Sequence, residues 1–154
     1  MSLKLGETVP SVNLTDQDAK VFNTDHFKGE KAFVIYFYPK DFTPGCTQEA
    51  CDFRDRYREF KELGAEVIAI SADSETSHTK FINKYNLPFI FLSDKNKKAT
   101  KIFDVKSSFL GVIPGRETFI FDKIGILKMR YNNMNSSKHT TEAIKKLKEL
   151  QNEN

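Results

Sequence analysis

Apolar runs with strand character recur along this chain and predict the strands of a buried sheet. Three of them are nearly continuous, as expected of strands covered on both faces: "KAFVIYFY" at 31–38, "AEVIAISA" at 65–72 and "PFIFLSD" at 88–94. The segment "ETFIFDKIGILKMRY" at 117–131 predicts a hairpin that turns at 123–125, and 11–24 predicts a shorter, weaker hairpin.

Helical spacing of apolar residues fills the intervals between the strands. It predicts helices over 47–63, 74–86, 95–104 and 138–151. Strands and helices that alternate, followed by a hairpin, predict a single three-layer α/β domain over 1–154, with a mixed central sheet flanked by helices. In such sheets, catalytic groups gather where the carboxyl end of a strand meets the start of a helix.

Composition narrows the range of partners. The 24 basic and 21 acidic residues give a net charge of +3, which is too even to favour nucleic acid as the main partner. The longest apolar run is far too short to cross a membrane, and the first ten residues lack the apolar core of a signal peptide. We therefore expect a cytoplasmic protein without a membrane partner.

The chain has only two cysteines, which favours a redox role for them. In the reducing cytosol, a lone pair of cysteines is more often catalytic, redox-active or metal-binding than a structural disulfide. A metal site is not expected, because His26, His78 and His139 show no ligand spacing around the cysteines. We expect His78 and His139 on helix surfaces.

Both cysteines lie in "YPKDFTPGCTQEACDF" at 38–53, where a strand ends and a helix begins. Thr43 is the predicted N-cap, and Pro44 suits the first helical position, which tolerates a missing N–H. Cys46 then falls in the first turn, where free N–H groups and the helix dipole favour a thiolate. Gly45 would let a substrate approach the backbone.

Helix geometry separates the two thiols. Cys46 falls on the apolar face with Ala50 and Phe53, whereas Cys51 lies about 140° away, with a Cα–Cα distance of about 8.6 Å. A disulfide needs about 4.4–6.8 Å. The two cysteines can therefore bond only if the first turn unwinds. An alternative remains open, in which both are buried small hydrophobes.

The same stretch resembles the active-site segment of peroxiredoxins, and specifically of the Q-type, also called bacterioferritin comigratory protein. The family pattern P-x-x-x-T-x-x-C is met by Pro39, Thr43 and Cys46, and the Q-type's second cysteine by Cys51. An arginine just before a late strand is matched by Arg116. The order of elements also fits a thioredoxin-like fold over nearly the whole chain.

The resemblance implies a thiol-dependent peroxidase that reduces hydrogen peroxide or organic hydroperoxides. Cys46 would be the peroxidatic nucleophile, and Cys51 the resolving cysteine that forms an intramolecular disulfide with it. A thioredoxin-type protein would reduce that disulfide. The resemblance implies no cofactor and no metal, and it is compatible with a monomer or a weak homodimer.

Further roles follow from the same resemblance. Arg116 would be a cation on the thiolate and would polarise the peroxide, Thr43 would place a hydroxyl beside the sulfur, and Pro39 would shield the pocket. Glu49 would either orient Arg116 through an ion pair or be a solvated carboxylate of the first turns. Tyr38 would either line the pocket or be a core aromatic residue.

Two other functions would use the same residues differently. In a redox sensor or adaptor, the Cys46–Cys51 disulfide would change a partner interface, and turnover with any reductant would be poor. In an inert thioredoxin-like binding module, both thiols would be buried and slow to alkylate. Turnover and alkylation rates distinguish these functions from a peroxidase.

Overall fold

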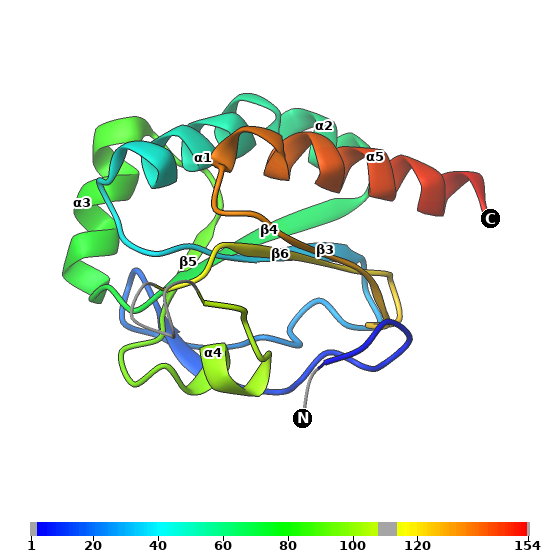
Figure 1. Ribbon diagram of the computed structural model, residues 1–154, viewed down its shortest axis with the longest axis horizontal. Helices are drawn as coiled ribbons and strands as arrows, with labels where there is room; N and C mark the ends of the chain where they lie inside the picture. Colours follow the sequence, from blue (N-terminus) through cyan, green and yellow to red (C-terminus); the bar gives the residue numbers. More distant parts are fainter. Residues whose placement is uncertain (1–2, 108–113, 154) are drawn as a thin grey trace.

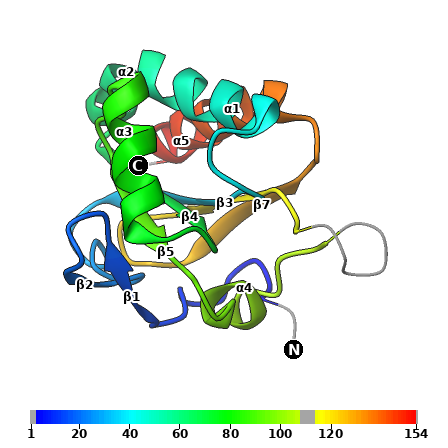
Figure 2. The same ribbon diagram turned by 90° about the vertical axis from the view of Figure 1, so that its left-hand side faces the viewer.

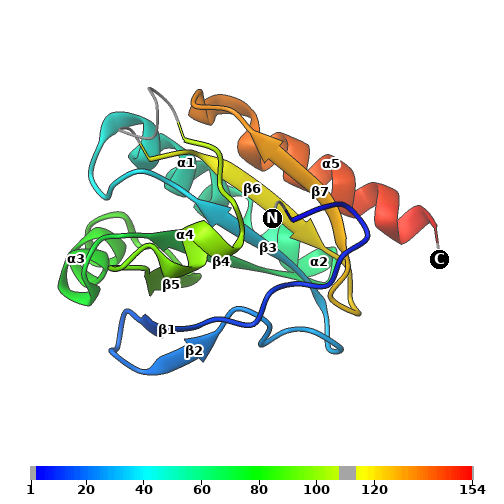
Figure 3. The same ribbon diagram turned by 60° about the horizontal axis from the view of Figure 1, so that its bottom comes forward.

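A seven-stranded mixed sheet runs through residues 3–107 and 114–153, which the computed structural model describes. Its order is β2-β1-β5-β4-β3-β6-β7, and Figure 3 shows β1 and β2 along one edge and β7 along the other. The β3, β4 and β5 strands pair in parallel, whereas the other pairings are antiparallel. The strands are β1 (Asn13–Asp16), β2 (Val21–Asn23), β3 (Ala32–Phe37), β4 (Ala65–Ser71), β5 (Ile90–Ser93), β6 (Glu117–Phe121) and β7 (Leu127–Asn132).

Helices cover both faces of the sheet, which confirms the predicted three layers. Figures 1 and 2 show α1, α2, α3 and α5 on one face and α4 on the other. Within the described ranges, no helix is both long enough and apolar enough to span a membrane. The helices are α1 (Pro44–Asp55), α2 (Tyr57–Glu62), α3 (Glu75–Tyr85), α4 (Lys98–Ile102) and α5 (His139–Asn152), with a short 3-10 helix, η1 (Ser136–Lys138).

Alternate side chains of β3 pack into two hydrophobic cores, one on each face of the sheet. Val34 and Tyr36 pack beneath α1, α2, α3 and α5, and Phe33 and Ile35 pack on the opposite side with α4 and the N-terminal segment. Because both faces of the strand are buried, its sequence is continuously apolar instead of alternating. This double coverage fixes the carboxyl end of β3, from which the chain passes to α1.

The helix predicted over 47–63 is in fact two helices. Its backbone breaks at Arg56, with φ −111° and ψ 13°, and this residue separates α1 from α2. Phe53 and Phe60 are nevertheless both fully buried on the same side of the sheet. The apolar spacing keeps its register across the break, so periodicity did not reveal it.

The prediction that His78 and His139 lie on helix surfaces is wrong, because both side chains are fully buried. A buried imidazole is tolerated when its two nitrogens find hydrogen-bond partners, and both rings do so. The partners are Asp41 and the carbonyl oxygen of Leu92 for His78, and Thr118 and the carbonyl oxygen of Asn133 for His139.

Candidate active site

Cys46 lies in the first turn of α1, just beyond the carboxyl end of β3. Thr43 is extended at the N-cap position, with φ −71° and ψ 152°, and Pro44 begins the helix as predicted. The Cys46 side chain is only 2% exposed, on the inward face. Thr43 does not cap the helix with its side chain; its hydroxyl donates to the carbonyl oxygen of Lys40 at 2.8 Å.

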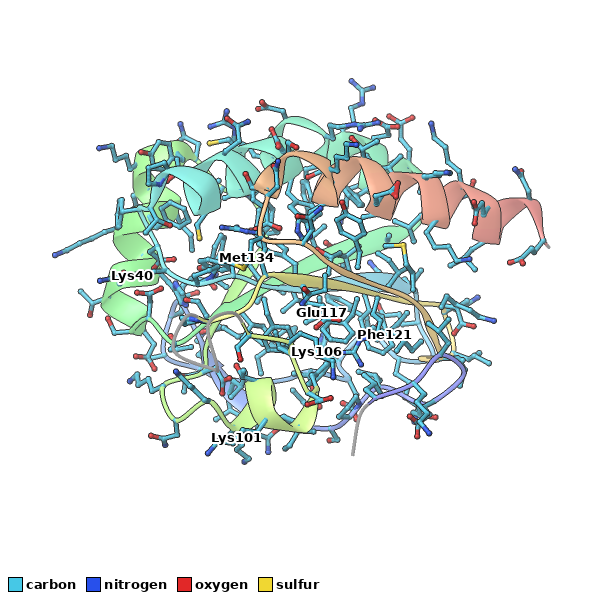
Figure 4. The ribbon with its side chains drawn as sticks, viewed as in Figure 1. Lys40, Lys101, Lys106, Glu117, Phe121 and Met134 are labelled. Carbon is cyan, nitrogen blue, oxygen red and sulfur yellow. The ribbon has the colours of Figure 1, made fainter. Side chains whose placement is uncertain are left out.

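The guanidinium of Arg116 is fixed against this turn by three hydrogen bonds. Its Nη2 donates to Cys46 Sγ at 3.5 Å, and its Nη1 donates to Glu49 Oε1 at 2.6 Å. Its Nε donates to the carbonyl oxygen of Met134 at 3.0 Å, from the segment labelled in Figure 4. Arg116 directly precedes β6 and is 4% exposed, so the structure holds a buried cation at the thiol.

Glu49 is fully buried one turn after Cys46. Of the two possibilities raised by the sequence, the structure contains the ion pair with Arg116, and a solvated carboxylate is excluded. Burial raises the pKa of Glu49 to about 8, although Arg116 acts in the opposite direction. Its second oxygen, Oε2, lies 3.5 Å from Nδ1 of His139.

His139, at the start of α5, completes this buried cluster and was not predicted as a site residue. Its Nε2 lies 2.7 Å from the carbonyl oxygen of Asn133, which can only accept, so Nε2 carries the hydrogen. Nδ1 therefore accepts from the hydroxyl of Thr118 at 2.7 Å. Burial lowers the pKa of His139 to about 4, and a neutral ring adds no second positive charge beside Arg116.

The guanidinium of Arg116 lies directly beside Gly45. A Cβ atom at Gly45 would lie 3.0 Å from Nη2 of Arg116 and 3.9 Å from Oγ of Ser136. The missing side chain makes room for the guanidinium of Arg116, and the approach of a substrate to this backbone stays a prediction.

Cys51 lies farther along α1 on its flank and is partly exposed. Both cysteines are free thiols, as the helix geometry predicts for an intact first turn. Burial raises the pKa of the Cys51 thiol, and the charge of Arg54 opposes this shift. Cys51 is the more exposed of the two thiols.

Tyr38 is a core aromatic residue, which is one of the two roles that the sequence left open. Its side chain is buried in the helix-side core, and its hydroxyl donates to Asp41 Oδ1 at 2.5 Å. Tyr38 and Pro39 also line a cavity of about 380 Å³, together with Phe37, Ile70, Val105 and Gly115 among others. The loop that precedes Cys46 therefore borders both the core and a hollow at the end of the sheet.

Comparison with known proteins decides the family. The model of the AhpC/TSA family matches residues 5–130. The chain belongs to this family. It is 48% identical over 146 residues to the chloroplastic peroxiredoxin Q of Sedum lineare, covering 94% of this chain and 78% of the relative. The crystal structure of peroxidoxin BcpB from Mycobacterium tuberculosis superposes with a TM-score of 0.87 at 30% identity, covering 96% of this chain and 98% of the other.

A solved structure of Xanthomonas campestris peroxiredoxin Q gives a TM-score of 0.82 at 31% identity, over 90% of each chain. These findings confirm the predicted Q-type peroxiredoxin, its thioredoxin-like fold and its thiol peroxidase function. In this peroxiredoxin, Cys46 and Arg116, seventy residues apart in sequence, meet in one buried site.

One residue that places Arg116 was missed by the sequence reasoning. A Cβ atom at Gly115 would lie 1.7 Å from the carbonyl oxygen of Lys106, so only glycine fits this close approach. The same stretch is held by a hydrogen bond from the Lys106 N–H to Glu117 Oε1 at 3.2 Å, and Figure 4 labels both residues. Gly115 thereby fixes the backbone from which the Arg116 side chain departs.

We expect Gly115→Ala to lower the rate of peroxide reduction about tenfold, because a misplacement of about 1 Å in a catalytic group carries costs of this order or more. The added methyl group meets backbone, so a flexible side chain cannot relieve the contact. The second-order rate constant with hydrogen peroxide, measured where circular dichroism shows the variant folded, tests this expectation. A wild-type rate constant would show that Gly115 does not position Arg116.

The neutral state of His139 predicts acid destabilisation. Its pKa is about 4 in the folded protein, against 6.5 for an ordinary histidine, so the unfolded chain binds the proton more tightly. The contribution of His139 to the free energy of unfolding is fully present above pH 6.5, the pKa of the unfolded state, and it is lost as the pH falls from 6.5 to about 4. It amounts to about 3 kcal/mol.

Urea unfolding across this window measures the effect. We expect His139→Asn to flatten the acid limb of the stability profile, whereas His26→Gln, at an exposed histidine, should leave it unchanged. An acid limb of the same slope in wild type and His139→Asn would contradict the prediction.

Proposed function

We propose that this peroxiredoxin reduces hydroperoxides at Cys46, with Arg116 as the activating cation. The supporting observation is the buried guanidinium that donates to Cys46 Sγ and Glu49 Oε1 at the same time. The thiolate sulfur would attack one peroxide oxygen and break the O–O bond. Cys46 becomes a sulfenic acid, and the other oxygen leaves as water or an alcohol after it takes up a proton.

The residues around Cys46 would each have a separate role when the O–O bond breaks. Arg116 stabilises the thiolate and the charge that develops on the leaving oxygen, and Glu49 holds it in place. The Thr43 hydroxyl already donates to the carbonyl of Lys40, so its oxygen is available to accept a hydrogen bond from the peroxide O–H. Pro39 lines the cavity at the end of the sheet, and its role as a shield of the sulfur against water stays a prediction.

Resolution would follow by attack of the Cys51 thiol on the sulfenic sulfur, which releases water and forms the Cys46–Cys51 disulfide. Both cysteines belong to α1, so its first turn has to unwind before this bond can form. A thioredoxin-type dithiol protein would then reduce the disulfide. A cytoplasmic location and a monomer or weak homodimer stay predictions.

Mass spectrometry after one equivalent of hydrogen peroxide tests the proposal. We expect an intramolecular Cys46–Cys51 disulfide in the wild-type protein. Cys51→Ser is the matched variant, and it should react once and stop as a sulfenic acid on Cys46. A disulfide between two chains, or oxidised protein with a free Cys51, would overturn the assigned resolving step.

A further inference from the structure

A second buried polar cluster lies at the loop between β3 and α1, which precedes Cys46, and the peroxide chemistry does not use it. At its centre is Asp41, which is 4% exposed and lies between β3 and α1. Its carboxylate accepts three hydrogen bonds, from the hydroxyl of Tyr38 at 2.5 Å, the hydroxyl of Ser77 at 2.8 Å and Nδ1 of His78 at 2.8 Å. Ser77 and His78 both belong to the first turn of α3.

The His78 ring gives this cluster the character of a buried ion pair. Its Nε2 lies 3.1 Å from the carbonyl oxygen of Leu92 on β5, which can only accept a hydrogen bond. Its Nδ1 faces the Asp41 carboxylate, so both nitrogens face acceptors, and a ring with a hydrogen on each nitrogen satisfies both. Such charge-assisted contacts are among the stronger hydrogen bonds in proteins.

The backbone of the loop is held as well as the side chain. The N–H of Asp41 donates to Asp73 Oδ2 at 2.8 Å, and that carboxylate also accepts from Ser71 at 2.6 Å. Asp41 is therefore tied through its side chain to α3 and through its backbone to the end of β4. We call Asp41 and its partners Tyr38, Ser77, His78 and Asp73 the Asp41 anchor.

The residue that follows the anchor is strained in the closed loop. Phe42 has φ +68°, a left-handed conformation that is unfavourable for a bulky side chain, and it is 43% exposed while its ring packs edge-on against Phe81. Unwinding the turn that follows would release this strain. The anchor thus holds closed a loop whose own backbone favours opening.

We propose that the Asp41 anchor sets how readily the turn around Cys46 opens, and so controls the fate of the sulfenic acid. In the opened turn, Cys51 attacks the sulfenic sulfur and releases water. In the closed turn, the sulfenic acid of Cys46 stays beside Arg116. There a second hydroperoxide transfers an oxygen atom to its sulfur, giving the sulfinic acid and water or an alcohol. This inference rests on the proposed function, because it presumes that Cys51 resolves Cys46.

The direction of the effect follows from population shift. Contacts made only in the closed turn favour it, so weakening them raises the opened fraction and the rate of disulfide formation by the same factor. The first reaction with peroxide uses the closed turn, which stays the major form, and its rate constant should change little. Asp41 and His78 are accordingly positioning residues that do not touch the reacting atoms.

Two variants of graded strength test the anchor. Asp41→Asn removes the charge and keeps the shape, and Ser77→Ala removes one donor. After exposure to rising concentrations of hydrogen peroxide, acid quenching and alkylation followed by mass spectrometry give the disulfide and sulfinic fractions. We expect disulfide formation about tenfold faster in Asp41→Asn and a few-fold faster in Ser77→Ala. The peroxide concentration that yields half sulfinic acid should rise by the same factors.

Phe121→Leu is the control for a general loss of stability. Phe121 is fully buried, and Figure 4 shows it far along the sheet from Lys40, the neighbour of Asp41. This variant should leave the partition between disulfide and sulfinic acid unchanged. An equal shift in Phe121→Leu, or no shift in both anchor variants while wild type forms its disulfide, would overturn the inference.

Two further outcomes separate the inference from its premise. If the wild-type protein forms no Cys46–Cys51 disulfide, the proposed resolving step fails first. If Asp41→Asn and Ser77→Ala lose the first reaction with peroxide while they remain folded, the anchor serves the chemical step and the inference of control by opening is wrong. Ser77→Ala keeps the test decisive if Asp41→Asn does not fold.

Discussion

Cys46→Ser is expected to abolish peroxidase activity, lowering turnover of hydrogen peroxide about a thousandfold or more, as for other covalent nucleophiles. A serine hydroxyl at this position would still lie against Arg116 in the first turn of α1. It would not ionise near neutral pH, however, and its oxygen is far less reactive than a thiolate towards the O–O bond. Consumption of hydrogen peroxide coupled to a thioredoxin system measures the loss.

Cys51→Ser is the matched control for this prediction, since it removes the other thiol from the same helix. It should consume one equivalent of peroxide per chain at the wild-type rate and then stop. Full activity in Cys46→Ser would exclude Cys46 as the nucleophile. Rapid oxidation of Cys46 with poor turnover by any dithiol reductant would instead favour the redox sensor over the peroxidase.

Local signals made the start of α1 predictable from the sequence. An N-cap residue and a proline at the first helical position act within one turn, so Thr43 and Pro44 were enough to place Cys46 among the free N–H groups. The buried strands were predictable for a similar reason, since a sheet covered on both faces requires continuous apolar runs. Both inferences depend on neighbours in the sequence.

Contacts between segments that are distant in the sequence were harder to predict. Spacing left two possibilities for Glu49, because its ion-pair partner Arg116 lies on another element of the fold. The need for glycine at 115 arises from the backbone of Lys106, which no local pattern reveals. The burial of these groups, and hence the raised pKa of Glu49, follows only from the assembled layers.

One missed residue did carry a signal in the sequence. His139 lies four residues before Ala143 and eight before Leu147, so it continues the buried stripe of α5. A polar residue on an apolar stripe is informative, since its burial requires partners. The prediction of a surface position followed from residue type and overlooked the spacing.

Arg116→Lys is expected to lower the rate constant for peroxide reduction about 10²–10³-fold, the usual loss when a donor to the transition state is removed. The guanidinium donates from three nitrogens to Cys46, Glu49 and the carbonyl oxygen of Met134. A lysine ammonium is a point charge without this fork, so it cannot reach all three partners at once. Stopped-flow measurement of the first oxidation gives the rate constant.

A paired substitution separates catalysis by Arg116 from its structural role. Arg116→Met alone leaves the buried Glu49 carboxyl without its partner. Because the pKa of this carboxyl is about 8 even with Arg116 present, it is then protonated near neutral pH, and we expect the unpaired polar group to lower the free energy of unfolding by about 1–3 kcal/mol. Adding Glu49→Leu removes the unpaired polar group and should restore much of this stability. It should not restore the peroxide rate constant, because no cation then faces Cys46 Sγ. Recovery of activity together with stability in the double variant would show that Arg116 acts only through the fold.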